Sequence, residues 1–261
     1  KIQRKLPDST LIERTVNKIK KASNPMIVAG GGAIYSGSES VMKEFSEKHG
    51  IPVTETFAGK GTLHYSNPFN LGGIGATGTK GANEIAKNSD LVIGVGTRYG
   101  DFTTASKSVW QNKNVEFINI NVAEFDAFKN SAIPLQGDAR ETLKIISHKL
   151  ENHSTDKGYI EKIKALSREW DDIVSKIYHT DNPERPVQSE LLGAVNEFMD
   201  EKDVVLCAAG SAPGDLHKLW RTKNSKGFHL EYGNSCMGYE IPGGLGVKMA
   251  DPSREVYVIC G

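Results

Sequence analysis

The sequence is poor in cysteine: its 261 residues include only three, Cys207, Cys236 and Cys260. They lie far apart and none belongs to a C-x-x-C pair, which argues against a structural zinc site and against a disulfide framework. A reducing compartment, the cytoplasm, is therefore the expected location. Cys207 and Cys260 fall in apolar runs typical of strands, and we predict that both are small core residues rather than nucleophiles.

An excess of charge of either sign is also absent, because Lys plus Arg and Asp plus Glu both number 32. A general nucleic-acid-binding protein normally carries a basic excess, so nucleic acid is not an expected partner. No apolar run approaches the length of a membrane span, and no signal peptide opens the chain. The first residues are interpreted as a charged linker that ends at Pro7, and no membrane partner is expected.

Apolar runs typical of strands alternate with amphipathic helical runs through residues 8–150. Strands are expected within residues 26–32, 51–57, 91–96, 115–121 and 133–138, and helices within 10–22, 40–50, 81–90 and 139–150. Thr10 with Glu13 is interpreted as the capping box of the first helix, and Gly50 as the C-terminal cap of the second. This alternation predicts a parallel, doubly wound, Rossmann-like α/β sheet, and we assign residues 1–150 to a central domain.

The composition changes after this domain. An amphipathic run between two polar stretches is interpreted as a helical linker, which we assign to residues 151–186. A second α/β domain is assigned to residues 187–261. Its strands are expected within residues 203–210, 228–232 and 254–260. Three strands are few for a parallel sheet, so this domain is expected to be truncated. The β-branched residues Val256, Val258 and Ile259 predict a last strand that is buried on both faces.

A glycine-rich stretch, AGGGAIYSG at residues 29–37, joins the first predicted strand to a helix. Glycines at such a turn let a pyrophosphate approach the helix N-terminus, and Glu55 ends the next strand, where a ribose-binding acid belongs. The dinucleotide fingerprint is incomplete, because Tyr35 stands where a third glycine is expected after Gly30 and Gly32. A tight turn explains the glycines equally well, so a simple turn and a site for NAD or another nucleotide both stay open.

A second glycine-rich stretch, residues 72–104, contains a loop, a helix, a strand and a further polar loop. This order predicts a small-molecule crevice at the carboxyl edge of the sheet. Nothing in the stretch supplies a general base beside a nucleophile. We therefore expect Arg98 and Asp101 to lie at the surface or to line the crevice, without a catalytic role.

A third loop, within residues 208–220, follows a predicted buried strand and leads into a helix. The backbone N–H groups of Gly210, Ser211 and Ala212 are candidates for holding a phosphate. An ordinary loop with a helix cap has the same local sequence, so both interpretations stay open. We expect His217 to face solvent from the helix.

The last stretch, EYGNSCMGYEIPGGLGVKMADPSREVYVICG at residues 231–261, combines a polar loop with a small-residue helix and a final apolar strand. It resembles the cofactor-binding domain of thiamine diphosphate enzymes of the acetolactate synthase type. Those enzymes carry a glycine-rich loop with Met-Gly, a small-residue helix, the motif P.REV and a strand ending in Gly-Asp-Gly. Residues 75–104 are similar to the central domain of the same family, and the resemblance extends over nearly all of the chain.

The resemblance implies three α/β domains, of which this chain holds the middle one and the front of the third. It also implies roles for particular residues of the third domain. Gly210, Ser211 and Ala212 would lie near the diphosphate of the cofactor. Ser235 would offer its backbone carbonyl to the amino group of the aminopyrimidine ring.

The same resemblance assigns the methionine loop and the end of the chain. Met237, next to Cys236 in the loop, would wedge between the two rings and hold the cofactor bent. Gly261 matches the first glycine of Gly-Asp-Gly, and in the family the acid after it and a later Asn bind magnesium. Those ligands would lie beyond Gly261, so neither a metal ligand nor a catalytic residue is expected in this chain.

Within the family, residues 210–220 and 228–252 most resemble the members that hydrolyse a ring carbon–carbon bond of trihydroxycyclohexane-1,2-dione to 5-deoxy-glucuronate in myo-inositol degradation. This implies thiamine diphosphate and Mg²⁺ as cofactors, a cyclic dione as substrate, and a homodimer or homotetramer. A carboligase that makes acetolactate or tartronate semialdehyde stays open, as do an NAD-dependent oxidoreductase and a structural or assembly module. The chain alone is expected to be inactive, and no flavin is expected.

Overall fold

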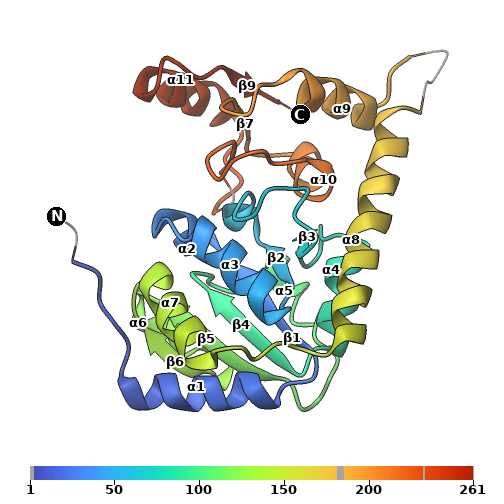
Figure 1. The fold of residues 1–261 in the computed structure, drawn as a ribbon. Coiled ribbons are helices and arrows are strands. Elements are labelled where there is room, and N and C mark those ends of the chain that lie inside the picture. Colours follow the sequence, from blue (N-terminus) through green and yellow to red (C-terminus); the bar gives the residue numbers. More distant parts are fainter. Residues whose placement is uncertain (1–2, 181–184, 232, 261) are drawn as a thin grey trace.

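The computed structural model describes residues 3–180, 185–231 and 233–260. Its larger sheet has six parallel strands in the order β3-β2-β1-β4-β5-β6 (Figure 1). These strands are β1 (Pro25–Ala29), β2 (Val53–Glu55), β3 (Asn70–Gly73), β4 (Leu91–Val95), β5 (Glu116–Asn121) and β6 (Ile133–Gln136). The strand order reverses between β1 and β4, as it does in a doubly wound sheet. The predicted parallel, Rossmann-like α/β fold is therefore confirmed, although β3 is not among the predicted strands.

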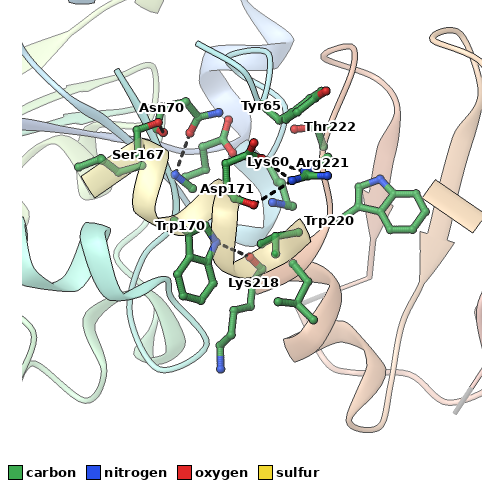
Figure 2. A pocket seen from close by; sticks show the side chains of 15 residues that line it. Lys60, Tyr65, Asn70, Ser167, Trp170, Asp171, Lys218, Trp220, Arg221 and Thr222 are labelled. Carbon is green, nitrogen blue, oxygen red and sulfur yellow. Dashed lines mark hydrogen bonds and ion pairs between the residues drawn. The ribbon is translucent and has the colours of Figure 1, made fainter. Parts of the chain in front are cut away.

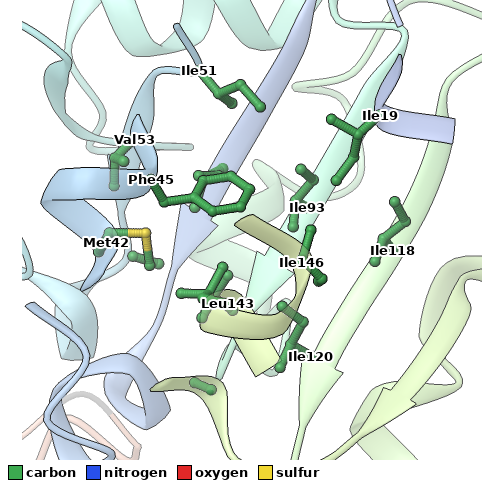
Figure 3. Close-up of a cluster of buried hydrophobic side chains, with 14 of the residues drawn as sticks. Ile19, Met42, Phe45, Ile51, Val53, Ile93, Ile118, Ile120, Leu143 and Ile146 are labelled. Carbon is green, nitrogen blue, oxygen red and sulfur yellow. The ribbon is translucent and has the colours of Figure 1, made fainter. Parts of the chain in front are cut away.

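Helices cover both faces of this sheet, because successive strand residues are apolar and point to opposite sides. Ile27 of β1 packs in a buried cluster with residues of α1 (Ser9–Lys21), α3 (Glu39–His49) and α7 (Ala139–Leu150). Figure 3 shows Phe45 of α3 at the centre of that cluster. Met26 points the other way and packs in a second cluster with residues of α4 (Lys80–Asn88).

The ends of the helices follow local chemistry. Asp8, rather than Thr10, caps α1: its Oδ1 accepts the N–H groups of Thr10 and Leu11. The predicted capping box is therefore wrong, because an aspartate two residues before Thr10 takes the first free N–H groups. Gly50 ends α3 in the left-handed region, at φ 67°, as predicted.

The predicted linker helix is α8 (Lys157–Tyr178), with 22 residues. At the usual rise its length is about 33 Å, and it runs along one side of the molecule from the larger sheet to the smaller one (Figure 1). Its first half buries Tyr159 and Ile163 against the larger sheet, and its end buries Tyr178 beside Leu219. The helix is therefore packed against both halves of the chain.

The smaller sheet has three parallel strands in the order β8-β7-β9. Its elements are α9 (Gln188–Phe198), β7 (Val204–Cys207), α10 (Ala212–Leu219), β8 (Phe228–Leu230), α11 (Glu240–Ala250) and β9 (Val256–Val258). The prediction of a fully buried last strand is wrong: Val256, Val258 and Ile259 are only half-buried. The reason is that β9 pairs with β7 alone among the described strands.

The two cysteines predicted to be core residues differ. Cys207 lies in the central strand β7 and is buried, and burial raises the pKa of its thiol to about 11, which keeps it unreactive at neutral pH. Cys260 is exposed, so its predicted burial is wrong; it lies just past the edge strand. Among the described helices, none is both long and apolar enough to cross a membrane.

The remaining elements are short and connect the longer ones. They are α2 (Gly31–Tyr35), η1 (Phe57–Gly59), α5 (Asp101–Thr104), α6 (Glu124–Ala127) and η2 (Lys129–Ser131). Several of them lie just past the carboxyl ends of strands of the larger sheet, on the side that faces the smaller sheet (Figure 1). They therefore shape the region where the two sheets meet.

Candidate functional site

The loop between β7 and α10 has the geometry of an anion-binding turn. Gly210 adopts a φ of 90°, a conformation that favours glycine, and turns the chain into α10. Ser211 is the N-cap of α10 and its side chain makes no capping bond. Ala212 begins the helix, and its N–H has no intrahelical acceptor, whereas Pro213 has no N–H and the N–H groups of Gly214 and Asp215 donate to the Ser211 carbonyl. The helix dipole favours negative charge at this end. The three predicted phosphate-binding residues are thus brought together at one helix start.

The loop at residues 233–239, which we call the methionine loop, is held by a carboxylate that the sequence analysis missed. Glu231 accepts the N–H groups of Gly233, Asn234 and Cys236 at 2.9, 3.0 and 2.8 Å. These bonds, the one from Cys236 first, hold the pKa of Glu231 below its ordinary value, so it is ionised at neutral pH. Ser235 lies inside this turn at a φ of 50°.

Met237 projects from the methionine loop into solvent, with 89% of its surface exposed. Cys236 beside it is also exposed. A lone methionine in a loop is more often a core residue, but this one has no core to fill. The Met237 side chain is therefore available to contact a bound ligand, next to the turn that contains Ser235.

His217 is not on the surface, and the expectation of a solvent-facing histidine is wrong. It is 1% exposed and lies between the two sheets. Its Nε2 lies 2.9 Å from the Glu55 carbonyl oxygen, which only accepts, so Nε2 carries the proton. Its Nδ1 then accepts from the Thr77 hydroxyl at 2.9 Å. Burial, helped by the charge of Lys60, lowers the pKa of His217 to about 3, and the ring is neutral.

His217 fits between the sheets because of two neighbours. The Phe57 ring lies 4.2 Å away, centroid to centroid. Gly73 has no side chain, and a Cβ there would lie 2.7 Å from His217 Cε1 and Nε2. Hydrophobic periodicity assigns a polar residue of a short helix to its solvent-exposed face. The burial of His217 therefore follows only from its tertiary contacts.

Glu55 also differs from its predicted role as a ribose-binding acid. It does end β2, but it is fully buried and lines a cavity whose lining contains no residue of the glycine-rich turn (Figure 2 shows this cavity). Its Oε1 accepts the N–H groups of Gly61 and Leu63 at 3.1 and 3.2 Å. Its Oε2 has no hydrogen-bond partner among the described residues. The carboxylate therefore organises the segment after η1.

Lys60 is the charged neighbour of Glu55 and is itself only 3% exposed. Burial raises the pKa of Glu55 and lowers the pKa of Lys60, while each charge opposes the shift of the other. Both line a cavity of about 50 Å³ between β2, α8 and the end of α10 (Figure 2). A cavity of this size holds a few water molecules, so we assign it a structural role.

The glycine-rich turn after β1 is explained by packing. A Cβ on Gly32 would lie 2.7 Å from the Cα of Gly96, and a Cβ on Gly30 would lie even closer to the carbonyl oxygen of Gly96. The tight-turn interpretation therefore accounts for these glycines. The turn also borders a cleft of about 410 Å³ that Arg98 and Asp101 line, as predicted, and that extends to Ser235.

Two predictions concern residues or ions that the described structure does not include. Gly261 lies outside the described residues. Among residues 3–180, 185–231 and 233–260, no group of three or more His, Cys, Asp or Glu side chains is arranged to hold a metal ion. The site assembled by the structure thus consists of the loop 208–211 before α10, the methionine loop and the cleft beside Ser235.

Two family models match the chain. The model of the thiamine pyrophosphate enzyme central domain matches residues 12–146, which is more than half of the chain. The chain belongs to the thiamine pyrophosphate enzymes. The model of the C-terminal, thiamine pyrophosphate-binding domain of these enzymes matches residues 208–261, which contain both loops of the candidate site. The resemblance inferred from the sequence is confirmed.

Curated relatives are similar over the whole chain. A 3D-(3,5/4)-trihydroxycyclohexane-1,2-dione hydrolase of Clostridium tetani is 41% identical over 285 residues, covering 100% of this chain and 44% of the relative. Proteins of the same name from Bacillus thuringiensis and Bacillus anthracis are each 39% identical with the same coverage. The chain therefore spans less than half the length of these curated relatives.

The residues of the site fit a thiamine diphosphate cofactor in two respects. Donors at the start of α10 suit a diphosphate, whose oxygens are anionic acceptors. The exposed Met237 suits an aromatic ring, because a thioether makes favourable contacts with ring edges and faces.

Proposed function

We propose that this chain contributes the diphosphate side of a thiamine diphosphate site in an enzyme that hydrolyses a carbon–carbon bond of a trihydroxycyclohexane-1,2-dione. The observation that carries the proposal is the pairing of the α10 start with the methionine loop inside the segment matched by the cofactor-binding domain. The substrate is proposed from the names of the relatives, at 39–41% identity over the whole chain. Ring opening would give 5-deoxy-glucuronate.

Each loop has a separate task in this proposal. Gly210, Ser211 and Ala212 bind the diphosphate through backbone N–H groups. The Ser235 carbonyl accepts from the amino group of the aminopyrimidine ring, and Met237, with Cys236 at its side, holds the cofactor bent and keeps water from the reacting atoms. When bound, thiamine diphosphate supplies the electron sink that lets a bond beside a carbonyl break.

The overall reaction is a redox-neutral hydrolysis. The bond between two ring carbons breaks; one carbon gains a hydrogen from water, and the other gains the hydroxyl and becomes a carboxylic acid. We propose Mg²⁺ as the counter-ion of the diphosphate, because this hard cation prefers oxygen ligands and commonly binds phosphates.

The test uses protein expressed from its complete open reading frame, assayed with Mg²⁺, thiamine diphosphate and either the cyclic dione or pyruvate. We expect 5-deoxy-glucuronate from the dione and no acetolactate from pyruvate. Acetolactate from pyruvate as the main product would instead establish a carboligase. No reaction in the presence of the cofactor would contradict both.

A substitution at Met237 tests the proposed contact between this side chain and the rings of the cofactor. Because Met237 is 89% exposed, Met237→Ala is expected to change the free energy of unfolding by less than about 0.5 kcal/mol. It should nevertheless lower kcat/KM by about tenfold or more, since the ring contact is lost. Leu191→Ala, at an exposed apolar residue of α9, is the control and should leave kcat/KM unchanged.

We further propose a cytoplasmic homodimer or homotetramer. The location is supported by three free cysteines, two of them exposed. The assembly is supported by an apolar stripe on α11, formed by Ile241, Leu245 and Met249, which are 65%, 61% and 73% exposed. Light scattering coupled to size-exclusion chromatography tests the assembly, and a monomer at micromolar concentration would contradict it.

A further inference from the structure

Glu240 connects the two loops of the candidate site. It is the first residue of α11, and only 5% of its surface is exposed. Its Oε1 accepts the N–H of Ala209 at 3.1 Å, and its Oε2 accepts the N–H of Gly238 at 2.9 Å. The two oxygens of one carboxylate thus bind two different segments of backbone.

The position of each donor makes this connection informative. Ala209 immediately precedes Gly210, at the start of the proposed diphosphate loop, residues 208–211. Gly238 immediately follows Met237 in the methionine loop. Because a carboxylate is rigid and planar, bonds from both oxygens fix the separation of the two loops as well as the conformation of each.

The bonds are strong ones. Hydrogen bonds from backbone N–H groups, including its own and that of Ala209, hold the pKa of Glu240 below its ordinary value, so it is ionised at neutral pH. Charge-assisted bonds of this kind are about twice as strong as those between neutral groups. Gly238, at a φ of 88°, gives the chain the turn that aims its N–H at this carboxylate.

We propose that Glu240 is a positioning residue that holds the diphosphate loop and the methionine loop at a fixed separation, so that one cofactor meets both. The inference rests on the proposed function, because it assigns the two loops to the same ligand. Glu240 does not itself touch the cofactor in this arrangement. It sets the distance between the N–H groups at the α10 start and the Met237 side chain.

The test compares Glu240→Gln with Glu39→Gln. Gln keeps the size of Glu240 but replaces one acceptor oxygen by an NH₂ group, so only one of the two loops is still held. Glu39 is likewise the first residue of its helix, α3, so its variant controls for the loss of a negative charge at a helix start.

Two measurements are made on protein from the complete open reading frame. Amide hydrogen exchange at Ala209 and Gly238 is expected to become at least about tenfold faster at one or both positions in Glu240→Gln and to stay unchanged in Glu39→Gln. The Kd for thiamine diphosphate with Mg²⁺, from calorimetry, is expected to rise at least about tenfold in Glu240→Gln only. Exchange at Ile27 in the larger sheet reports whether the fold as a whole is retained.

The outcomes separate this inference from the proposed function. Unchanged exchange at both amides overturns the inference, and so does faster exchange with an unchanged Kd. If the wild-type protein does not bind thiamine diphosphate, the proposed function fails and the positioning role fails with it, whatever the exchange shows. Should Glu240→Gln not fold, Glu240→Asp is measured in the same way; it keeps the charge on a side chain one methylene shorter, and wild-type behaviour in it overturns the inference.

Discussion

Removing the charge of Lys60 should destabilise the protein strongly, because the Glu55 carboxylate beside it is fully buried and one of its oxygens has no partner among the described residues. Taking away one member of a directly bonded buried charge pair costs about 3–5 kcal/mol, since the other charge is left uncompensated. Lys60 and Glu55 influence each other electrostatically without a direct ion pair among the described residues, so this cost is an upper bound. For a protein of this size each kcal/mol lowers the melting temperature by about 2–4 °C, so Lys60→Met should melt below wild type by at most about 20 °C.

The double variant Lys60→Met with Glu55→Gln makes this reasoning specific. It removes both charges, so the penalty of an isolated buried charge disappears and the double variant should be more stable than either single one. The assay is urea and thermal unfolding followed by circular dichroism. Lys80→Met is the control: its partner Glu169 lies 2.6 Å away but both side chains are exposed, so its melting temperature should stay close to that of wild type.

The two single variants should also depend on pH in opposite directions. Burial raises the pKa of Glu55 above its ordinary 4.5, so without Lys60 the folded state favours the neutral acid and stability falls as pH rises from 4.5 through the raised value. Burial lowers the pKa of Lys60 below 10.5, so in Glu55→Gln stability falls as pH drops from 10.5 through the lowered value. Equal stabilities of Lys60→Met and the double variant at pH 8 would refute the reasoning.

Two further predictions concern the contact between the sheets. His217 has a pKa of about 3 in the folded state against an ordinary 6.5, so its contribution to stability is complete above pH 6.5 and is lost as pH falls toward 3. In His217→Gln, urea unfolding should show a smaller loss of stability on acidification than in wild type. An unchanged dependence of the unfolding free energy on pH would contradict this. Gly73→Ala should cost about 1–3 kcal/mol, because its Cβ would lie 2.7 Å from the His217 ring. A Cβ added to Gly246, inside α11, would have open space around it, so Gly246→Ala should instead stabilise the folded protein by about 0.4–1 kcal/mol. Equal effects of the two substitutions on the melting temperature would contradict the packing described.

The sequence predicts what depends on local periodicity. Five of the six strands of the larger sheet and its long helices follow from apolar runs and amphipathic spacing, and Gly50 follows from its place after a helix. The strand β3 is not predicted, because Asn70, Gly72 and Gly73 leave it with almost no apolar pattern. Local pattern therefore carries most of the fold.

What the sequence does not predict depends on contacts between distant segments. His217 is polar and sits in a short helix, so its burial follows only from the carbonyl of Glu55 and the hydroxyl of Thr77, which other elements bring to it. In the sequence, Glu240 and Glu231 are only acidic residues near glycines. Their roles could not be predicted, because their hydrogen-bond partners are backbone N–H groups, which every residue type except proline has. The burial of His217, the edge position of β9 and the bond from Ala209 to Glu240 all arise from tertiary geometry rather than from spacing.

The central claim is that one thiamine diphosphate contacts both loops, and the most direct measurement is an experimental structure of the protein, expressed from its complete open reading frame, with the cofactor and Mg²⁺. The account predicts the diphosphate at the N–H groups of Gly210, Ser211 and Ala212, the amino group of the aminopyrimidine ring at the Ser235 carbonyl, and Met237 against the rings. Cofactor density elsewhere, or a diphosphate at the glycine-rich turn of residues 29–37, would contradict it.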